Sequence, residues 1–322
     1  MSEFTIDPWV PVNFEPLPLL SLNAGLRYDA AFVKTHVDAW SGIGLDPMTG
    51  LPAPMSYTAE DESTQWDAFV YEAGLTVNPF DFLKIYAKYG TQFRYPYLDD
   101  LVVLPMYAGA AVGLNTGLEP EKGWTAEGGI GVNIKGIARF DANLYYQRID
   151  NEITAVLAGM MYSTMNLDPI ARLGTNIGLK LTPFKNYVEL DLDYGFVNSE
   201  FSEGANEGKF VPLAAQHMLS GSLMLYLPFG LSLGPNVLYK SEMYQGFDNA
   251  NALPTVDPSF IWGASVRYVP RKFSNLAVHL AVHNIADTKY ATLVYAMPMI
   301  GTAYYVDNNM GRSVKLSVQY SF

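Results

Sequence analysis

The chain has 322 residues, of which 16% are charged, and its net charge is −12 at pH 7. This acidic balance disfavours nucleic acid as a partner, because the sequence offers no basic stripe to phosphates. The absence of cysteine from the sequence excludes disulfides, thiol nucleophiles and cysteine-ligated metal sites.

Residues 1–18 are rich in proline and are expected to form a lead-in, in which Phe4–Val10 is a candidate short strand. The segment has neither the basic stretch nor the apolar stretch of a signal peptide. The longest uncharged stretches, 101–118 and 290–306, contain Pro and Gly, whereas a membrane helix needs about 20 predominantly apolar residues. Any membrane insertion is therefore expected to use a closed barrel, because only helices and barrels satisfy their backbone in lipid.

From residue 19 to residue 322 apolar residues recur with a period of two, which indicates β-strands. About twelve segments alternate in this way, and each has roughly the 9–11 residues of a tilted membrane strand. They begin near residues 19, 68, 82, 122, 137, 170, 186, 215, 229, 258, 275 and 312. We therefore expect residues 19–322 to form one all-β domain, an antiparallel up-and-down transmembrane β-barrel of about twelve strands or part of a larger one.

The connections between these segments alternate in length. Short connections cover 78–81, 133–136, 182–186, 227–230 and 270–275, and long ones cover 32–66, 95–121, 150–169, 199–213, 244–257 and 288–310. Short periplasmic turns and long external loops are typical of outer-membrane barrels. A soluble β-sandwich or lipocalin-like barrel is the alternative, but the polar face here is rich in Ser, Asn, Gly and Tyr, as expected of a wetted lumen.

Five stretches resemble the barrel of TonB-dependent outer-membrane receptors, in the order expected of that family. They are LSLNAGLRYD (20–29), AGLTVNPFDFLKIYAKYGTQFRYPYLDDL (73–101), LEPEKGWTAEGGI (118–130), HNIADTKYAT (283–292) and the closing strand GRSVKLSVQYSF (311–322). The resemblance covers nearly the whole chain. The opening, residues 4–29, resembles the strand, turn and strand that lie midway through the family's barrel, so the chain corresponds to roughly the last half of that barrel. No plug domain or Ton box is recognisable in the chain.

The resemblance implies a receptor in the outer membrane of a Gram-negative-type bacterium that takes up a scarce solute, such as a siderophore, a vitamin or a glycan. It implies a small-molecule ligand, outer-membrane lipid and the barrel-assembly machinery as partners, and TonB where a plug domain precedes the chain. Two alternatives stay open: a self-closed small barrel that acts as a passive porin-like channel, and an outer-membrane barrel enzyme such as a lipid hydrolase. We expect no enzyme activity, because the sequence contains no catalytic motif, and we expect no cofactor.

Aromatic segments in the predicted long loops supply the candidate ligand contacts, since Tyr gives contact area at a modest ordering cost. These candidates are Arg94, Tyr95, Tyr97, Tyr295, Tyr304 and Tyr305. Packing of loop against loop is the alternative role for the same residues. The terminal residue, Phe322, is the expected assembly signal, because barrels of the family typically end in an aromatic residue.

No metal site is expected. The acidic residues Glu189, Asp191 and Asp193 alternate along one predicted strand, about 6.6–6.8 Å apart along its axis, which is wide for the ligands of one ion. We expect instead an ion pair across the neighbouring strand, with Lys180 opposite Glu189.

Overall fold

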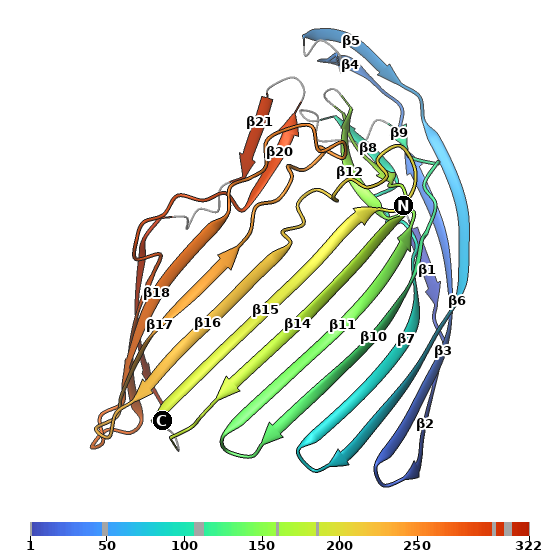
Figure 1. Cartoon of the computed structure of the whole chain (residues 1–322). Coiled ribbons are helices and arrows are strands. Elements are labelled where there is room, and N and C mark those ends of the chain that lie inside the picture. The colour runs from blue at the N-terminus through green and yellow to red at the C-terminus, as the bar shows by residue number, and fades with distance from the viewer. Residues whose placement is uncertain are drawn as a thin grey trace.

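The structure is a computed structural model that describes residues 2–46, 51–105, 113–158, 161–184, 187–297, 301–305 and 311–321. The described residues form strands and connections and contain no helix. Fourteen strands make one large curved sheet in which every neighbouring pair is antiparallel (Figure 1). The predicted all-β antiparallel fold is therefore confirmed.

The large sheet follows the chain from one edge to the other. Its strands are, in order, β1 (Ser2–Ile6), β3 (Leu20–Val37), β6 (Glu60–Phe80), β7 (Leu83–Arg94), β10 (Glu121–Ile134), β11 (Ala138–Asp150), β14 (Ile170–Leu181), β15 (Val188–Phe201), β16 (His217–Tyr226), β17 (Leu231–Lys240), β18 (Ser259–Tyr268), β19 (Leu276–His283) and β22 (Ser313–Tyr320). The fourteenth strand, β2 (Trp9–Leu17), pairs with β3 beside β1. Each of the twelve predicted segments corresponds to one strand from β3 to β22.

Strands β1 and β2 act as one strand along the edge of β3. Ile6 lies opposite Ala30 and Trp9 lies opposite Arg27, so the two strands share one register. They are separated only by Asp7 and Pro8, and Pro8 has no backbone N–H to offer the ladder. The segment before residue 19 therefore contributes one interrupted position to the sheet.

The two faces of the sheet differ in chemistry. Large apolar side chains stay exposed on the outer face at the middle of the strands, where Leu26 is 49% and Leu144 is 60% exposed. Side chains on the inner face are mostly polar and are paired across strands. A broad exposed apolar band around a polar interior is the arrangement that lipid on the outside and water on the inside would favour.

The described residues contain no helix long and apolar enough to cross a membrane.

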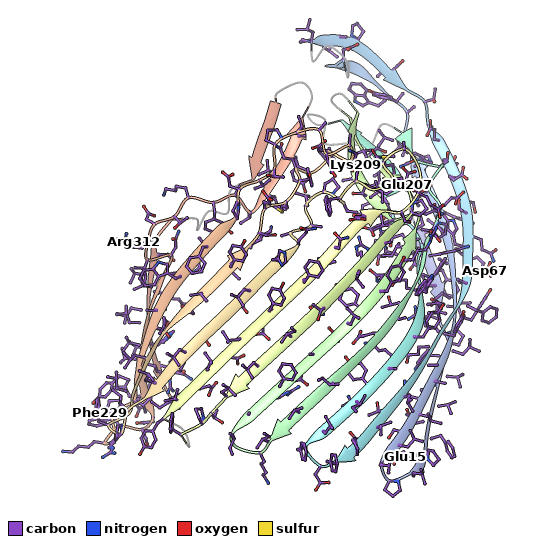
Figure 2. All side chains as sticks on the ribbon, viewed as in Figure 1. Glu15, Asp67, Glu207, Lys209, Phe229 and Arg312 are labelled. Carbon is purple, nitrogen blue, oxygen red and sulfur yellow. The ribbon has the colours of Figure 1, made fainter. Side chains whose placement is uncertain are left out.

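Short turns lie at one end of the sheet and long connections at the other. Figure 2 shows Glu15 and Phe229 at the short-turn end and Glu207 and Lys209 at the opposite end, which we call the loop end. The alternation of short and long connections predicted from the sequence is thus present in the structure.

The predicted long loops contain more strand than expected. Within 32–66, β3 and β6 continue to pair as far as Val37 and Glu60, and β4 (Trp40–Leu45) pairs with β5 (Pro52–Tyr57). Four short strands form a small sheet: β8 (Val102–Pro105), β9 (Gly113–Leu114), β12 (Ile153–Ala158) and β13 (Met161–Asn166). β20 (Leu293–Met297) pairs with β21 (Gly301–Tyr305). The short strands within these long connections were not predicted, because their alternation is short and lacks the polar inner face of the barrel strands.

The buried core lies at the loop end. One cluster joins Val33 on β3 to Leu101, Leu118 and Ile153, and Trp66 packs against it. Two further clusters are Leu167, Ile170, Phe201 and Val211, and Ala215, Met243, Val256 and Val294. The inner face of β3 changes from polar to apolar where the connections cover it. The core thus holds the connections in place over the end of the sheet.

Candidate functional site

Arg94 is the last residue of β7 and ties three segments together at the loop end. Its guanidinium contacts the Asp100 carboxylate at 3.1 Å and the Glu121 carboxylate of β10 at 2.9 Å. The same Glu121 oxygen accepts a hydrogen bond from the Ile153 backbone N–H over 2.8 Å. Because two partly buried carboxylates already satisfy the cation, Arg94 positions the connection 95–101 rather than offering a free positive charge.

Tyr97 is the exposed member of this group. The Arg94 guanidinium lies over its ring, 4.9 Å from the centroid. Asp100 accepts a hydrogen bond from the Tyr97 backbone N–H over 3.0 Å, and the Asp100 N–H donates to the Tyr97 carbonyl over the same distance. The ring nevertheless stays 50% exposed. The turn therefore holds an aromatic side chain open to solvent, a geometry suited to contact with a flat ligand.

Tyr95 is directed back into the wall. Its hydroxyl donates to the Glu3 carboxylate over 2.7 Å, and its ring stacks on Trp66 at 6.4 Å between centroids. Burial, followed by the hydrogen bond to Glu3, raises the pKa of Tyr95 to about 12, so the hydroxyl stays protonated and remains a donor. Tyr97 meets Tyr95 edge-on at 6.0 Å. Tyr95 thus supports Tyr97 and links β1 to the loop end.

Tyr295 belongs to a second group, on β20. Its ring contacts Phe247 at 5.0 Å between centroids and packs over Gly246, where an added Cβ would collide with the Tyr295 ring. The backbone of Tyr304 pairs with Val294 and that of Tyr305 with Leu293, while the side chains of both tyrosines lie outside the described part of the structure. Phe322 also lies outside the described residues. The structure therefore places Arg94, Tyr95 and Tyr97 together and Tyr295 in a separate contact with Gly246 and Phe247.

Three residues of the first group were not singled out from the sequence as site residues. Trp66, Asp100 and Glu121 come from three different segments that only the sheet brings together. Glu121 stood in a matched motif, but its pairing with Arg94 depends on the register of β7 and β10, in which the two residues lie directly opposite. No local sequence pattern shows that register.

Below this group the inner wall is a network of paired polar side chains. The Glu127 carboxylate accepts hydrogen bonds from the Tyr86 hydroxyl at 2.5 Å and from the Asn143 amide at 3.0 Å, and Lys88 pairs with it at 3.0 Å. Arg172 makes a two-pronged contact with Glu152 at 2.7 and 2.9 Å. These pairs leave the wall polar without a strong net charge, so it suits a wetted passage.

A shallow depression of about 460 Å³ lies on the wall beside Tyr86. Its polar lining includes Arg139, Asp141, Asn143 and Asp193, and Gly178 and Gly195 make room on its floor. Arg139 and Asp141 pair with each other at 2.6 Å, so this lining is also largely self-satisfied.

The predicted ion pair beside the acidic ladder is confirmed, with a different register. Lys180 reaches Glu189 at 2.7 Å, but the residue directly opposite Lys180 is Asp191, at 3.8 Å. The turn between β14 and β15 contains more residues than a tight hairpin, which moves the register by two residues. Within the described ranges no group of three or more His, Asp or Glu side chains is arranged to hold a metal ion.

His36 is the second-last residue of β3, at the loop end. It lies near the loop-end terminus of β3, whose 18 residues exceed the roughly 9–11 that a membrane strand needs. The two ring nitrogens of His36 lie 2.9 Å from Asp38 and 2.9 Å from Asp61. Hydrogen bonds to these two carboxylates, the one to Asp38 first and the one to Asp61 second, raise the pKa of His36.

Comparison with known protein families gives a match over most of the chain. The family model described as "TonB dependent receptor-like, beta-barrel" matches residues 6–285. The chain is similar to the probable TonB-dependent siderophore receptor PiuA of Acinetobacter baumannii, with 22% identity over 338 aligned residues. That alignment covers 96% of this chain and 39% of the relative.

Solved structures of the same architecture superpose on nearly the whole chain. The ferric yersiniabactin uptake receptor FyuA from Yersinia pestis gives a TM-score of 0.76 at 16% identity, and the copper transporter OprC gives 0.79 at 16%. The siderophore receptor PiuA from Acinetobacter baumannii gives 0.74 at 19%. The three superpositions cover 99% of this chain and 46%, 48% and 43% of those chains. The chain therefore spans less than half the length of the relatives it matches.

Proposed function

Because this chain belongs to the family of TonB-dependent receptor β-barrels, we propose that it forms part of the wall of a receptor that takes up a scarce solute across the bacterial outer membrane. The family consists of receptors and transporters of the Gram-negative outer membrane that bind a small-molecule ligand and interact with TonB. The match over residues 6–285 carries this proposal, and the exposed apolar outer face and polar inner wall support it.

The surface around Tyr97 is the proposed first contact for the ligand. It lies at the loop end, which faces the outside in this proposal, and it offers an exposed ring backed by the Arg94 guanidinium. Tyr95 and Arg94 act behind it as positioning residues, because their polar groups are already paired inside the wall. Tyr295, Tyr304 and Tyr305 are proposed as a second contact on the β20–β21 hairpin.

The proposed ligand class is a metal chelate of the siderophore type. The relatives named above are receptors for a siderophore and for ferric yersiniabactin, and one is a copper transporter. A chelate with aromatic groups would stack on the exposed ring face of Tyr97.

The remaining partners follow from the same proposal. Outer-membrane lipid covers the apolar outer face, and TonB is a partner where a plug domain precedes this part of the barrel. Phe322 is proposed as the signal for the barrel-assembly machinery. Deleting Phe322 should reduce outer-membrane insertion in cells while leaving refolding in detergent nearly unchanged, and wild-type insertion after the deletion would contradict that role.

Uptake by cells tests the ligand surface. Iron-starved cells that depend on the protein carrying this chain are given the radiolabelled ferric complex of 2,3-dihydroxybenzoate, with copper(II) as a second probe. Tyr97→Ala should weaken binding of the complex by about fivefold, corresponding to the roughly 1 kcal/mol of an exposed aromatic contact. Tyr187→Ala is the matched control, because Tyr187 is 56% exposed at the short-turn end. Equal uptake in both variants would contradict the proposed surface, and uptake of neither probe by the unaltered protein would contradict the ligand class.

A further inference from the structure

The ribbon that β3 and β6 form is interrupted at the loop end. The two strands pair as far as Val37 and Glu60, and beyond these residues β4 pairs with β5. We call β4 and β5 the arm. Figure 1 shows the arm projecting beyond the other connections of the loop end. Its direction therefore depends on the backbone that joins it to β3 and β6.

The joint is a short step without a ladder. Residues 38–39 and 58–59, which we call the hinge step, belong to no strand. Trp40 lies opposite Tyr57 directly beyond the step, so the register of the arm continues that of β3 and β6 with no extra residue on either side. The rings of Trp40 and Tyr57 pack together at 5.8 Å between centroids, which makes the arm a structured unit. A few residues between two structured units are where a change in direction is absorbed.

The side chain of His36 joins the hinge step to both strands below it. It shares one face of the ribbon with Asp38, two residues further on, and with Asp61, which lies directly opposite on β6. Its Nε2 lies 2.9 Å from the Asp38 carboxylate, and its Nδ1 lies 2.9 Å from the Asp61 carboxylate. One contact thus fastens the hinge step to β3, and the other fastens β3 to β6.

The two contacts together require a protonated ring. A carboxylate accepts hydrogen bonds and donates none, and a neutral imidazole has only one N–H, whereas both nitrogens of an imidazolium donate. The observed arrangement is therefore that of the imidazolium. Hydrogen bonds to Asp38 and then to Asp61 raise the pKa of His36, in agreement with this geometry. When the ring loses its proton, it can keep only one of the two hydrogen bonds.

The other charged residues beside His36 do not replace these contacts. Lys34 lies two residues earlier on the same face, whereas Glu60 and Glu62 alternate onto the opposite face of the ribbon. The Glu60 carboxylate accepts a hydrogen bond from the Leu114 backbone N–H over 2.9 Å. Of these residues, His36 is thus the one whose charge changes near neutral pH and whose side chain reaches the hinge step.

We propose that His36 is a proton-operated latch for the arm: the imidazolium holds the hinge step in line with β3 and β6, and the neutral ring releases it. Where the loop end faces outside, as in the proposed function, the proton comes from the external medium. All three side chains of the latch are exposed, and exposed ion pairs are weak. The latch therefore shifts the populations of arm directions by about a few-fold and leaves the barrel unchanged. It sets the position of Ile43 on the arm, an apolar side chain that is 78% exposed.

Pulsed electron paramagnetic resonance measures the direction of the arm. Nitroxide labels are attached at Ile43→Cys and Asp67→Cys in the lipid-reconstituted protein that carries this chain, with any cysteine outside residues 1–322 replaced by serine. At about 3.3 Å per residue, a label at position 43 lies about 13 Å beyond Ala39, so a change in direction alters the distance between the labels by several ångströms. The control pair is Asp67→Cys with Lys209→Cys, two exposed positions that do not span the hinge step (Figure 2).

We expect one dominant distance between labels 43 and 67 at about pH 5, and a share of that distance that is lower by about a few-fold at about pH 9. His36→Gln cannot gain the proton, so the broad distribution should be present at both pH values. Asp38→Ala should give the same result, because it removes the contact with the hinge step and leaves Asp61 in place. Lys34→Gln is the matched control, which changes a charge on the same face and should keep the pH response.

A distance distribution that is the same at both pH values in the unaltered protein would overturn the proposal. A pH response that persists in His36→Gln would overturn it as well. An equal shift between labels 67 and 209 would do so by showing that the loop end moves as a whole. The readout needs neither ligand nor uptake, so its failure is distinct from failure of the proposed function.

Discussion

Replacing Arg94 by Ala should loosen the connection 95–101 far more than the fold of the barrel. The change leaves the Asp100 and Glu121 carboxylates, whose side chains are 16% and 15% exposed, without their shared cation. Removing one partner from a fully buried pair costs about 3–5 kcal/mol, and exposed pairs contribute about 0–1 kcal/mol. Since the Arg94 side chain is 29% exposed, an intermediate cost of about 2 kcal/mol is expected. Such a cost corresponds to roughly a 30-fold rise in the equilibrium constant for local opening of the turn.

Hydrogen exchange measures that opening directly. The informative amides are those of Tyr97 and Asp100, because both are hydrogen-bonded within the turn. Arg139→Ala is the matched control, since Arg139 pairs with Asp141 where the side chains are 67% and 53% exposed, and the exchange of nearby amides should change less than about fivefold. Exchange of the two turn amides that is equally slow in the Arg94→Ala and unaltered proteins would refute the role of Arg94 in holding the turn.

Three further predictions follow from the two faces, the loop end and the edge. Leu144→Arg, at the middle of the outer face, should destabilise the lipid-reconstituted protein by about 2–4 kcal/mol. Asn176→Arg, on the inner face, should destabilise it by less than about 1 kcal/mol. Urea unfolding that ranks the two variants in the reverse order would contradict the assignment of the two faces. The pKa of His36 is raised in the folded protein, so the stabilisation from its ion pairs is complete below the ordinary pKa of 6.5 and is lost as pH rises through the raised pKa. Amide exchange at the end of β3 should speed up over that pH range, and His36→Gln should abolish this pH dependence. Gly25→Ala should push the Trp9 ring off β3, because an added Cβ would collide with it, and should shift the tryptophan fluorescence; an unchanged spectrum would show that Trp9 does not rest on Gly25.

Much of the barrel could be predicted from the sequence because its strands alternate on a strict period of two. Eleven of the twelve predicted starts lie within two residues of the observed strands, and β6 begins earlier, at Glu60. The extension of β3 and β6 was missed because its inner face is apolar, with Val33 only 2% exposed beneath the connections. That burial depends on Leu101, Leu118 and Ile153, which arrive from other connections.

The position of the candidate site could be predicted from the sequence, but the contacts of its residues could not. The aromatic segment YPYL pointed to 95–98, and the structure places Arg94, Tyr95 and Tyr97 together there. The sequence could not show that Arg94 is neutralised by Asp100 and Glu121, because that pairing arises from the register of β7 and β10. An arginine next to tyrosines in a loop therefore resembles a free binding group in sequence and acts as a support in the structure.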